Sequence, residues 1–150
     1  MKFKFPLQKV LDHRIVMQNI AQKDFQDAQA ILLEQEGVLR KMIGDLKEAR
    51  EEAGALALKT APDAPGRWKQ IHEFTILQDR RIEMQRAKVR DAEKLVEDKR
   101  DILRQKAIDS KMMERLKERR REQFIEEMKA TEQKDVDELN ILRFESKDGE

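Results

Sequence analysis

The sequence predicts an all-α protein in which two long helices fold back on each other as an antiparallel coiled-coil hairpin. Charged residues make up 42% of the 150-residue chain, against about 25% in ordinary soluble domains. There are only five glycines and three prolines, and apolar residues recur every three or four positions. Such a chain cannot fill a wide core, but it can bury a narrow seam between two helices. The regular apolar pattern also argues against intrinsic disorder.

The first expected helix covers residues 7–58. Pro6 suits its first turn, where the missing N–H group of proline is not needed. Two columns of residues repeat every seven positions, and eleven of these fourteen residues are apolar, which is typical of a coiled coil. The columns are Leu11, Gln18, Phe25, Leu32, Leu39, Leu46 and Ala53, and Arg14, Ala21, Ala28, Gln35, Met42, Ala49 and Leu56. We expect Gly37, Gly44 and Gly54 each to weaken this helix by about 1 kcal/mol relative to alanine.

A turn is expected at residues 60–66, because two prolines and Gly66 fall within five positions there. The second helix is expected at residues 67–143, with a flexible tail at 144–150. Its first part keeps seven-residue spacing through Ile82, Val89, Val96 and Leu103. The apolar stripe is then expected to shift towards the period of a straight helix. That shifted stripe passes through Ala107, Met113, Leu116 and Phe124.

The two expected helices differ in length. At 1.5 Å per residue they would extend roughly 80 Å and 115 Å. Pairing outward from the turn places Leu7 near residue 120, so the end of the second helix overhangs the first. Next to the turn, Trp68 and Phe74 lie beside Ile71 and Leu77. This cluster is expected either to close the hairpin as a buried plug or to stay exposed as an anchor for a partner.

Residue patterns that would indicate catalysis or cofactor binding are scarce. The two histidines, His13 and His72, fall on different helices, and the two serines, Ser110 and Ser146, have no activating partner nearby in the sequence. The chain has no cysteine and no Gly-rich phosphate loop. A thin pair of helices also offers no enclosed site for acid–base chemistry. We therefore expect no enzymatic activity, no metal and no cofactor.

The most unusual stretch is ERLKERRREQF, Glu114–Phe124, which holds five basic residues in eleven. A nucleic-acid grip is disfavoured, because the whole chain carries a net charge of only +1 and three glutamates interrupt the run. Stacking aromatic residues are absent apart from Phe124. A solvated helix face and a protein-docking surface remain the two main interpretations.

Both ends of the chain resemble the flagellar export protein FliJ family. FKFPLQKVLDHR, Phe3–Arg14, is similar to the family's F-x-L-Q-K-V-L-D opening. ERLKERRREQF followed by TEQKDVDEL is similar to its closing signature, a basic segment and then an E-Q-K-x-x-D-E box. The order, the spacing and the total length also agree, whereas the middle resembles the family only as a heptad-bearing hairpin.

The resemblance implies a soluble, non-enzymatic component of the flagellar type III export apparatus, similar to the central stalk of rotary ATPases. The expected partners are the export ATPase FliI, the cytoplasmic domain of the export gate FlhA, FliH and substrate-free export chaperones. No nucleic acid and no direct membrane insertion are expected, since no apolar run approaches the roughly 20 residues of a membrane span. The expected location is the cytoplasmic face of the inner membrane, at the flagellar base.

The resemblance also implies two groups of binding residues. The ATPase-binding group at the terminal end is Leu7, Val10, Leu11, Arg115, Leu116, Lys117, Arg119, Arg120, Arg121, Phe124, Glu132, Gln133, Asp137 and Glu138. The gate-binding group lies nearer the turn and is Met42, Leu46, Phe74 and Gln78. We expect the basic side chains of the first group to face acidic groups lining the ATPase ring.

Two other function classes stay open at this point. The chain could be a generic scaffolding coiled coil, in which case it would form a homodimer, or a nucleic-acid-binding helical rod. An intramolecular hairpin predicts a monomer for the isolated chain. The pairing register, and whether the system is a flagellum or a related injectisome, are left undetermined by the sequence.

Overall fold

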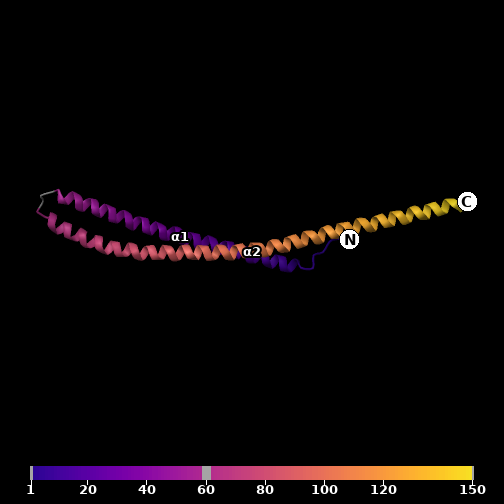
Figure 1. Cartoon of the computed structure of the whole chain (residues 1–150), viewed down its shortest axis with the longest axis horizontal. Helices are drawn as coiled ribbons and strands as arrows, with labels where there is room; N and C mark the ends of the chain where they lie inside the picture. Colours follow the sequence, from indigo (N-terminus) through magenta and orange to yellow (C-terminus); the bar gives the residue numbers. More distant parts are fainter. Residues whose placement is uncertain (1, 59–61, 150) are drawn as a thin grey trace. The chain divides into compact units, whose positions relative to one another are not determined.

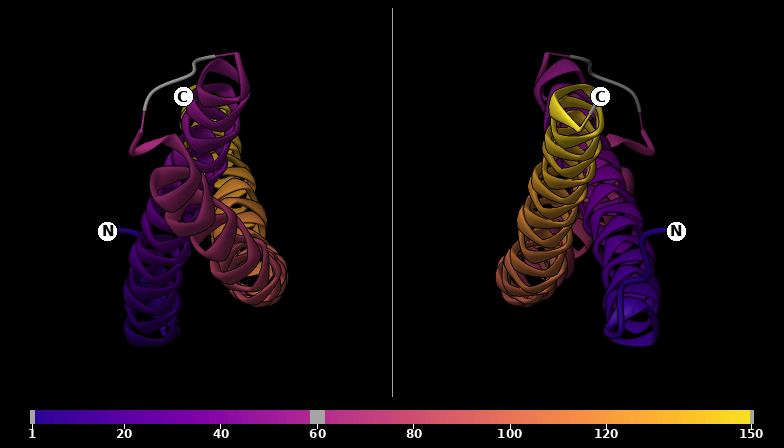
Figure 2. Two further views of the ribbon diagram at one scale, coloured as in Figure 1. Left: turned by 90° about the vertical axis from the view of Figure 1, so that its left-hand side faces the viewer. Right: turned by 90° about the vertical axis from the view of Figure 1, so that its right-hand side faces the viewer.

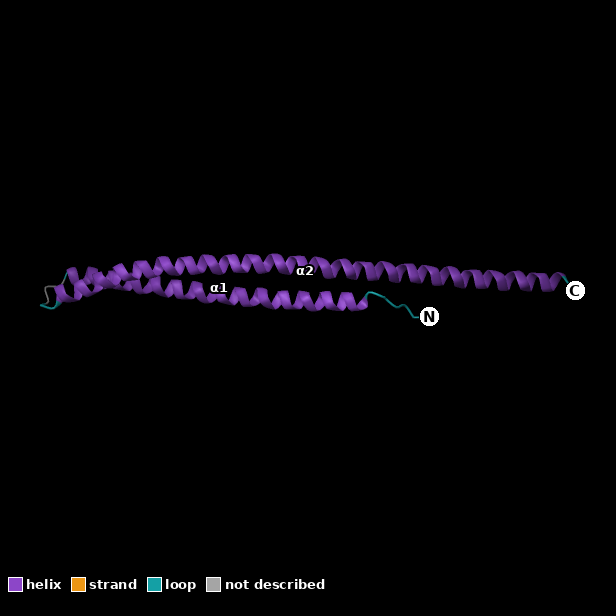
Figure 3. Cartoon of the chain, turned by 90° about the horizontal axis from the view of Figure 1, so that it is seen from below, coloured by secondary structure: helices purple, strands orange, loops and turns teal. Residues whose placement is uncertain are grey.

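The structure, a computed structural model, describes residues 2–58 and 62–149. Within that part the chain forms two helices, α1 (Gln8–Ala57) and α2 (Ala64–Asp148), and no strand (Figures 1 and 3). The prediction of an all-α protein built from two long helices is confirmed. Residues 60 and 61 of the expected turn lie outside the described residues.

Local hydrogen bonds explain where the helices begin. The N–H groups of Gln8 and Leu11 donate to the carbonyls of Phe5 and Leu7, at 3.1 and 3.0 Å. Pro6 thus lies in the turn that directly precedes α1 rather than in its first turn. The N–H of Arg67 donates to the carbonyl of Asp63 at 3.1 Å.

The second helix is longer at both ends than the sequence predicts. It begins at Ala64 rather than at 67, because Asp63 occupies the cap position and Pro65 fits the first turn, where proline is tolerated. Residues 144–148, which the sequence assigns to a tail, are part of α2, since the helix continues to Asp148. No proline or glycine interrupts the chain before Gly149, and Lys147 in the last turn interacts favourably with the helix dipole.

The chain divides into two compact units. The turn unit comprises residues 20–104, and the terminal unit comprises residues 2–19 together with 105–149. Each unit contains a stretch of α1 running antiparallel to a stretch of α2. Figure 2 (left) looks at the turn unit from its turn end, where the end of α1 and the beginning of α2 face the viewer.

In the turn unit, the seam on α1 follows the predicted heptad columns. Every residue of both columns that falls in this unit is buried or half-buried, from Ala21 to Leu56. The most buried are Ala28, 2% exposed, and Ala21, 4% exposed. Small seam residues of this kind allow two helices to approach closely.

The facing seam on α2 alternates steps of three and four residues. In the turn unit its buried members are Ile71, Gln78, Ile82, Gln85, Val89, Ala92 and Val96. Two glutamines therefore lie among the buried residues of this seam. Gln78 Nε2 donates to the Met42 carbonyl at 3.0 Å, and Gln85 Nε2 donates to both the carbonyl and Oε1 of Gln35, at 3.0 and 2.8 Å.

The terminal unit keeps the same spacing on α2. Ser110 and Met113 are buried and Lys117 is half-buried, opposite the buried Leu11 of α1. The Ser110 hydroxyl donates to Gln18 Oε1 at 2.5 Å, and Arg14 Nη1 donates to the Asp109 carbonyl at 3.0 Å.

The expected shift of the apolar stripe towards the period of a straight helix does not occur before Lys117, because the heptad spacing continues to that residue. Ala107 and Leu116 lie half-buried beside the seam, but α2 does not leave the heptad before Lys117. The seam looked irregular because polar side chains occupy several of its positions. Lys99 and Lys106 are half-buried there, as lysine can pack its aliphatic stem against apolar neighbours while the ammonium group reaches water.

The glutamine contacts fix the helix register more than they add stability. Buried side-chain nitrogen and oxygen atoms without a partner are absent from the described residues. A shift of one helix by a few residues would separate Gln78 and Gln85 from their acceptors, and each orphaned polar group would cost about 1–3 kcal/mol. An all-leucine seam would carry no such penalty.

We predict opposite results for two changes at the Gln35–Gln85 contact. Gln85→Ala should lower the free energy of unfolding by about 1–3 kcal/mol, because Gln35 loses its partner. Gln35→Leu combined with Gln85→Leu should unfold within about 1 kcal/mol of the parent or be more stable. Chemical denaturation followed by circular dichroism measures both. An equal loss in the two variants would contradict the register role.

We also predict that Gly44→Ala stabilises the chain by up to about 1 kcal/mol. Gly44 lies inside α1 without a positive φ angle, and nothing lies within 4 Å of the place that an added Cβ would take. Thermal and chemical unfolding measure the gain. Lys41→Ala, an exposed change on the same helix, is the control and should alter stability by less than about 0.5 kcal/mol. A loss of stability in Gly44→Ala would show that the open space is needed.

Candidate functional site

The strongest candidate site lies in the terminal unit, where the first residues of the chain pack on the basic part of α2. Residues 2–5 precede α1 without regular structure. The ring of Phe3 contacts that of Phe124, with centroids 5.7 Å apart and planes tilted by 47°. Edge-tilted aromatic pairs of this kind are favourable beyond their apolar area. The extended beginning of the chain is thus attached to α2 through an aromatic contact.

Two open cavities flank this aromatic contact. Phe3, Phe5 and Gln8 line the first with Lys117 and Arg121. The second cavity is lined by Phe3, Lys4, Pro6, Arg120, Gln123, Phe124 and Glu127. Both therefore have aromatic walls and positively charged rims. A partner that presents carboxylates next to apolar side chains would match both properties.

The basic run itself is positioned by the helix seam. Leu116 and Lys117 are half-buried, while Arg115, Arg119, Arg120 and Arg121 are exposed. Within residues 2–58 and 62–149, none of these cations takes part in an ion pair. The arginine guanidinium groups are therefore available to an external partner, and each can bind a carboxylate in a bidentate manner.

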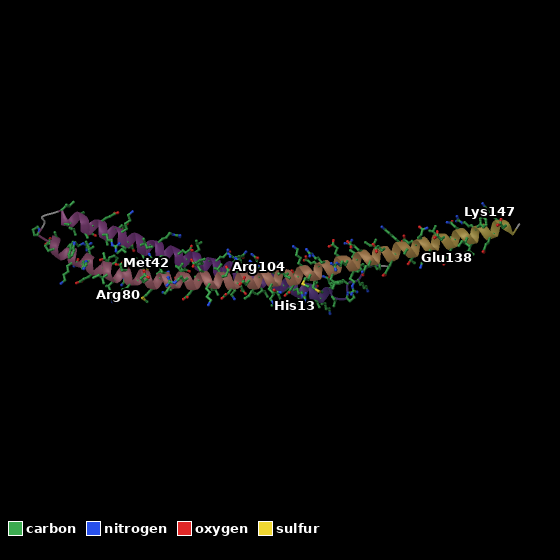
Figure 4. The ribbon with its side chains drawn as sticks, in the orientation of Figure 1. His13, Met42, Arg80, Arg104, Glu138 and Lys147 are labelled. Atoms are coloured by element: carbon green, nitrogen blue, oxygen red, sulfur yellow. The ribbon has the colours of Figure 1, made fainter. Side chains whose placement is uncertain are left out.

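Beyond the basic run, α2 has no helix beside it in the terminal unit (Figure 3). From Ile125 to Gly149 every residue is exposed except the half-buried Met128. Glu138 and Lys147, labelled in Figure 4, lie on this free segment. It nevertheless carries large apolar side chains: Val136, Leu139, Ile141, Leu142 and Phe144 are 50–68% exposed. Exposed apolar residues at this density on a charged helix indicate a surface that a partner covers.

The predicted ATPase-binding residues fall into three groups. Leu11 is buried in the seam, whereas Leu7 and Val10 are each 40% exposed. The residues of the basic run lie beside the opening segment, so the structure brings the first and second motifs together. The third group, Glu132, Gln133, Asp137 and Glu138, is fully exposed on the free segment, where Gln133 Nε2 donates to Asp137 Oδ1 at 2.9 Å.

The predicted gate-binding residues lie in the turn unit and are mostly parts of the seam. Leu46 and Gln78 are buried, Met42 and Phe74 are half-buried, and Gln78 donates to the Met42 carbonyl. Phe74 lines one open cavity and Leu46 lines another, together with Ile43, Lys47 and Arg50. Met42, Leu46 and Gln78 pack between the two helices, and binding of the export gate by this group stays a prediction.

The Trp68 side chain is 46% exposed, and its ring stacks on that of His72 with centroids 5.1 Å apart. Trp68 is thus not enclosed in a plug, while Ile71 is buried and Phe74 is half-buried. The other histidine of the chain, His13, is exposed in the terminal unit.

No group of three or more His, Cys, Asp or Glu side chains that could hold a metal occurs in the described part of the chain. In the same residues, no helix is both long and apolar enough to cross a membrane.

Sequence reasoning missed two residues of the site, Phe3 and Phe5. Both belong to the opening motif, yet they precede the helix and therefore fall outside any heptad column. Their alternation with Lys2 and Lys4 is too short to predict which distant surface they contact. The aromatic character of Phe3, Phe5 and Phe124 in a chain with only six phenylalanines was the available signal.

We predict that Phe3→Ala releases the opening segment from α2. Loss of the aromatic contact should reduce stability by about 1 kcal/mol and raise hydrogen exchange in residues 2–10. Hydrogen exchange with mass spectrometry measures the local effect. Phe144→Ala is the matched control, because Phe144 is 68% exposed and its ring is in no aromatic pair within the described residues. If Phe3→Ala leaves exchange unchanged, the contact does not hold the segment.

Comparison with protein families matches residues 3–149 to the family described as Flagellar FliJ protein. The match includes both terminal motifs and the whole region between them. Neither the comparison with curated proteins nor that with solved structures found a match.

Proposed function

The chain belongs to the FliJ family and is a flagellar export-related coiled-coil protein, and from this premise we propose that it is the stalk that couples the export ATPase FliI to the export gate FlhA. FliH and the export chaperones are its further proposed partners. The family is a non-catalytic component of flagellar export. Its proposed place is the cytoplasmic face of the inner membrane at the flagellar base.

One observation carries the ATPase part of this proposal: the free end of α2 beside the opening segment. The terminal unit presents unpaired arginines, aromatic cavity walls from the opening segment and α2, and an unpartnered stretch of α2 with exposed apolar side chains. A ring of ATPase subunits can enclose such an element on all sides, and a helix exposed all round is suited to that environment.

The charge pattern favours a contact that can be remade repeatedly. Lys111–Arg121 carries six basic and two acidic residues, and Glu132–Glu138 carries four acidic residues and one basic residue. Charges at the rim of a contact steer and orient partners more than they add affinity. A stalk inside a working ATPase needs that property, because an interface with very slow dissociation would stop the cycle.

The proposed gate contact uses the open cavity near the turn. Phe74, at the edge of this cavity, is the member of the predicted gate-binding group that a partner would contact directly. Leu46 lines a second open cavity but is only 7% exposed. Met42, Leu46 and Gln78 would act indirectly, by holding α1 and α2 in the register that forms the cavity at Phe74.

We predict that Arg119→Glu, Arg120→Glu and Arg121→Glu together abolish stimulation of FliI. Reversing three charges turns attraction to the acidic ring into repulsion. The measurement is the ATPase rate of FliI with and without the chain. The matched control reverses three exposed arginines of the turn unit, Arg80, Arg90 and Arg104, and should keep stimulation. Circular dichroism should show equal helicity in both variants, and full stimulation by the first would refute the assignment.

A further inference from the structure

The exposed apolar side chains of the turn unit gather along one flank of the helix pair. The flank is identified near the turn, where Glu52 of α1 and Arg67 of α2 form an ion pair at 2.9 Å. The same two residues line a cavity of about 340 Å³ together with Asp45, Gln70 and Phe74. Residues seven positions apart on either helix of a coiled coil lie on the same flank.

Counting in sevens from this cavity leads to apolar residues on both helices. On α1, counting back in sevens from Glu52 leads to Asp45, Val38 and Ile31. On α2, Leu77 and Met84 follow Gln70, and the series that contains Phe74 continues to Leu95 and Ile102. We call this flank the apolar face. Its exposed large side chains are Ile31, Val38, Leu77, Met84, Leu95 and Ile102, which are 36–67% exposed.

The opposite flank has a different composition. It contains the ion pair between Arg50 and Asp79, at 3.5 Å. Counting in sevens from Arg50 and Asp79 leads mainly to polar residues, among them Glu36, Gln29 and Arg86. We call this flank the charged face. Leu33, Ile43 and Ile76 are its exposed large apolar side chains.

The apolar face is also the more acidic of the two. Its carboxylates on α1 are Asp24, Asp27, Glu34, Asp45, Glu48 and Glu52. Only Glu52 among these forms an ion pair within residues 2–58 and 62–149. The single basic residue of α1 on this flank is Lys41. The basic residues of α2 here, Arg81 and Lys88 beside Arg67, are too few to balance the carboxylates of α1.

We propose that the apolar face of the turn unit binds a basic amphipathic helix of a partner protein, which packs along this face as a third helix. The face has apolar residues at helical repeat distances on both α1 and α2, as expected where an amphipathic helix docks. The unpaired carboxylates on the α1 rim select a helix with lysine or arginine beside its apolar stripe.

The same charges disfavour the other occupants. Two copies of the chain that met through this face would bring two acidic rims together, because a two-fold contact pairs each surface patch with itself. Anionic lipid and nucleic acid would be repelled by the carboxylates. The inference does not depend on the proposed ATPase contact, which uses the terminal unit, but it shares the cavity lined by Phe74 with the proposed gate contact.

The test uses the full chain and a fluorescent synthetic helix of about three heptads, with leucine at the seam positions and lysine elsewhere. Fluorescence anisotropy should show saturable binding, and a peptide with glutamate in place of lysine should bind at least about tenfold more weakly. Met84→Glu should weaken binding of the lysine peptide by about tenfold or more. The matched control is Leu33→Glu, since Leu33 is 63% exposed and Met84 is 67% exposed. This control should bind like the parent.

Several outcomes would overturn the proposal. Equal binding of the lysine and glutamate peptides removes the charge argument, and an equal loss in Leu33→Glu and Met84→Glu removes the face. If sedimentation shows that the chain self-associates and that Met84→Glu prevents it, the occupant is a second copy. Leu77→Glu is a second variant on the same face and should reproduce the loss seen with Met84→Glu. Circular dichroism checks that each variant remains helical.

Discussion

The structure depends on the narrow seam between α1 and α2. The seam residues are spaced by heptads, and the described chain has no other core. A core of this width buries little apolar area per residue, so the contacts must be placed correctly to hold the helices in one register. Alanines such as Ala21 and Ala28 bring the backbones close, and the seam glutamines then determine which residues lie opposite each other.

This dependence separates the roles of the side chains. Residues in the seam hold the helices, and residues outside it are available for partners. Met42, Leu46 and Gln78 belong to the first class, although the family resemblance implied that they form a binding surface. In a two-helix protein the core is a single seam, so the heptad position of a side chain determines whether it packs between the helices or is exposed to partners. Residues on the flanks of the seam are partly covered, so they can contribute both to helix pairing and to partner binding.

Much of the fold could be predicted from the sequence, because heptad spacing and helix punctuation are local signals. The α1 seam was predictable since its columns are mostly apolar, and the overhang of α2 followed from the unequal lengths. The α2 seam was harder to predict, because Ser110, Lys106 and Lys117 occupy positions that hydropathy assigns to solvent. The contact between Phe3 and Phe124 could not be predicted, since an extended segment carries no period that indicates which distant surface it meets.

The free end of α2 has a consequence for the temperature dependence of binding. An isolated helix must form its own first turn, which is unfavourable, and short isolated helices are only marginally stable in water. The segment beyond Ile125 avoids this cost, because it extends a helix that the seam has already nucleated. Its helicity is then set by propagation alone and decreases towards Asp148, more so on warming. A partner that binds near Phe124 meets an ordered helix, whereas one that binds near Phe144 must also supply the free energy of ordering.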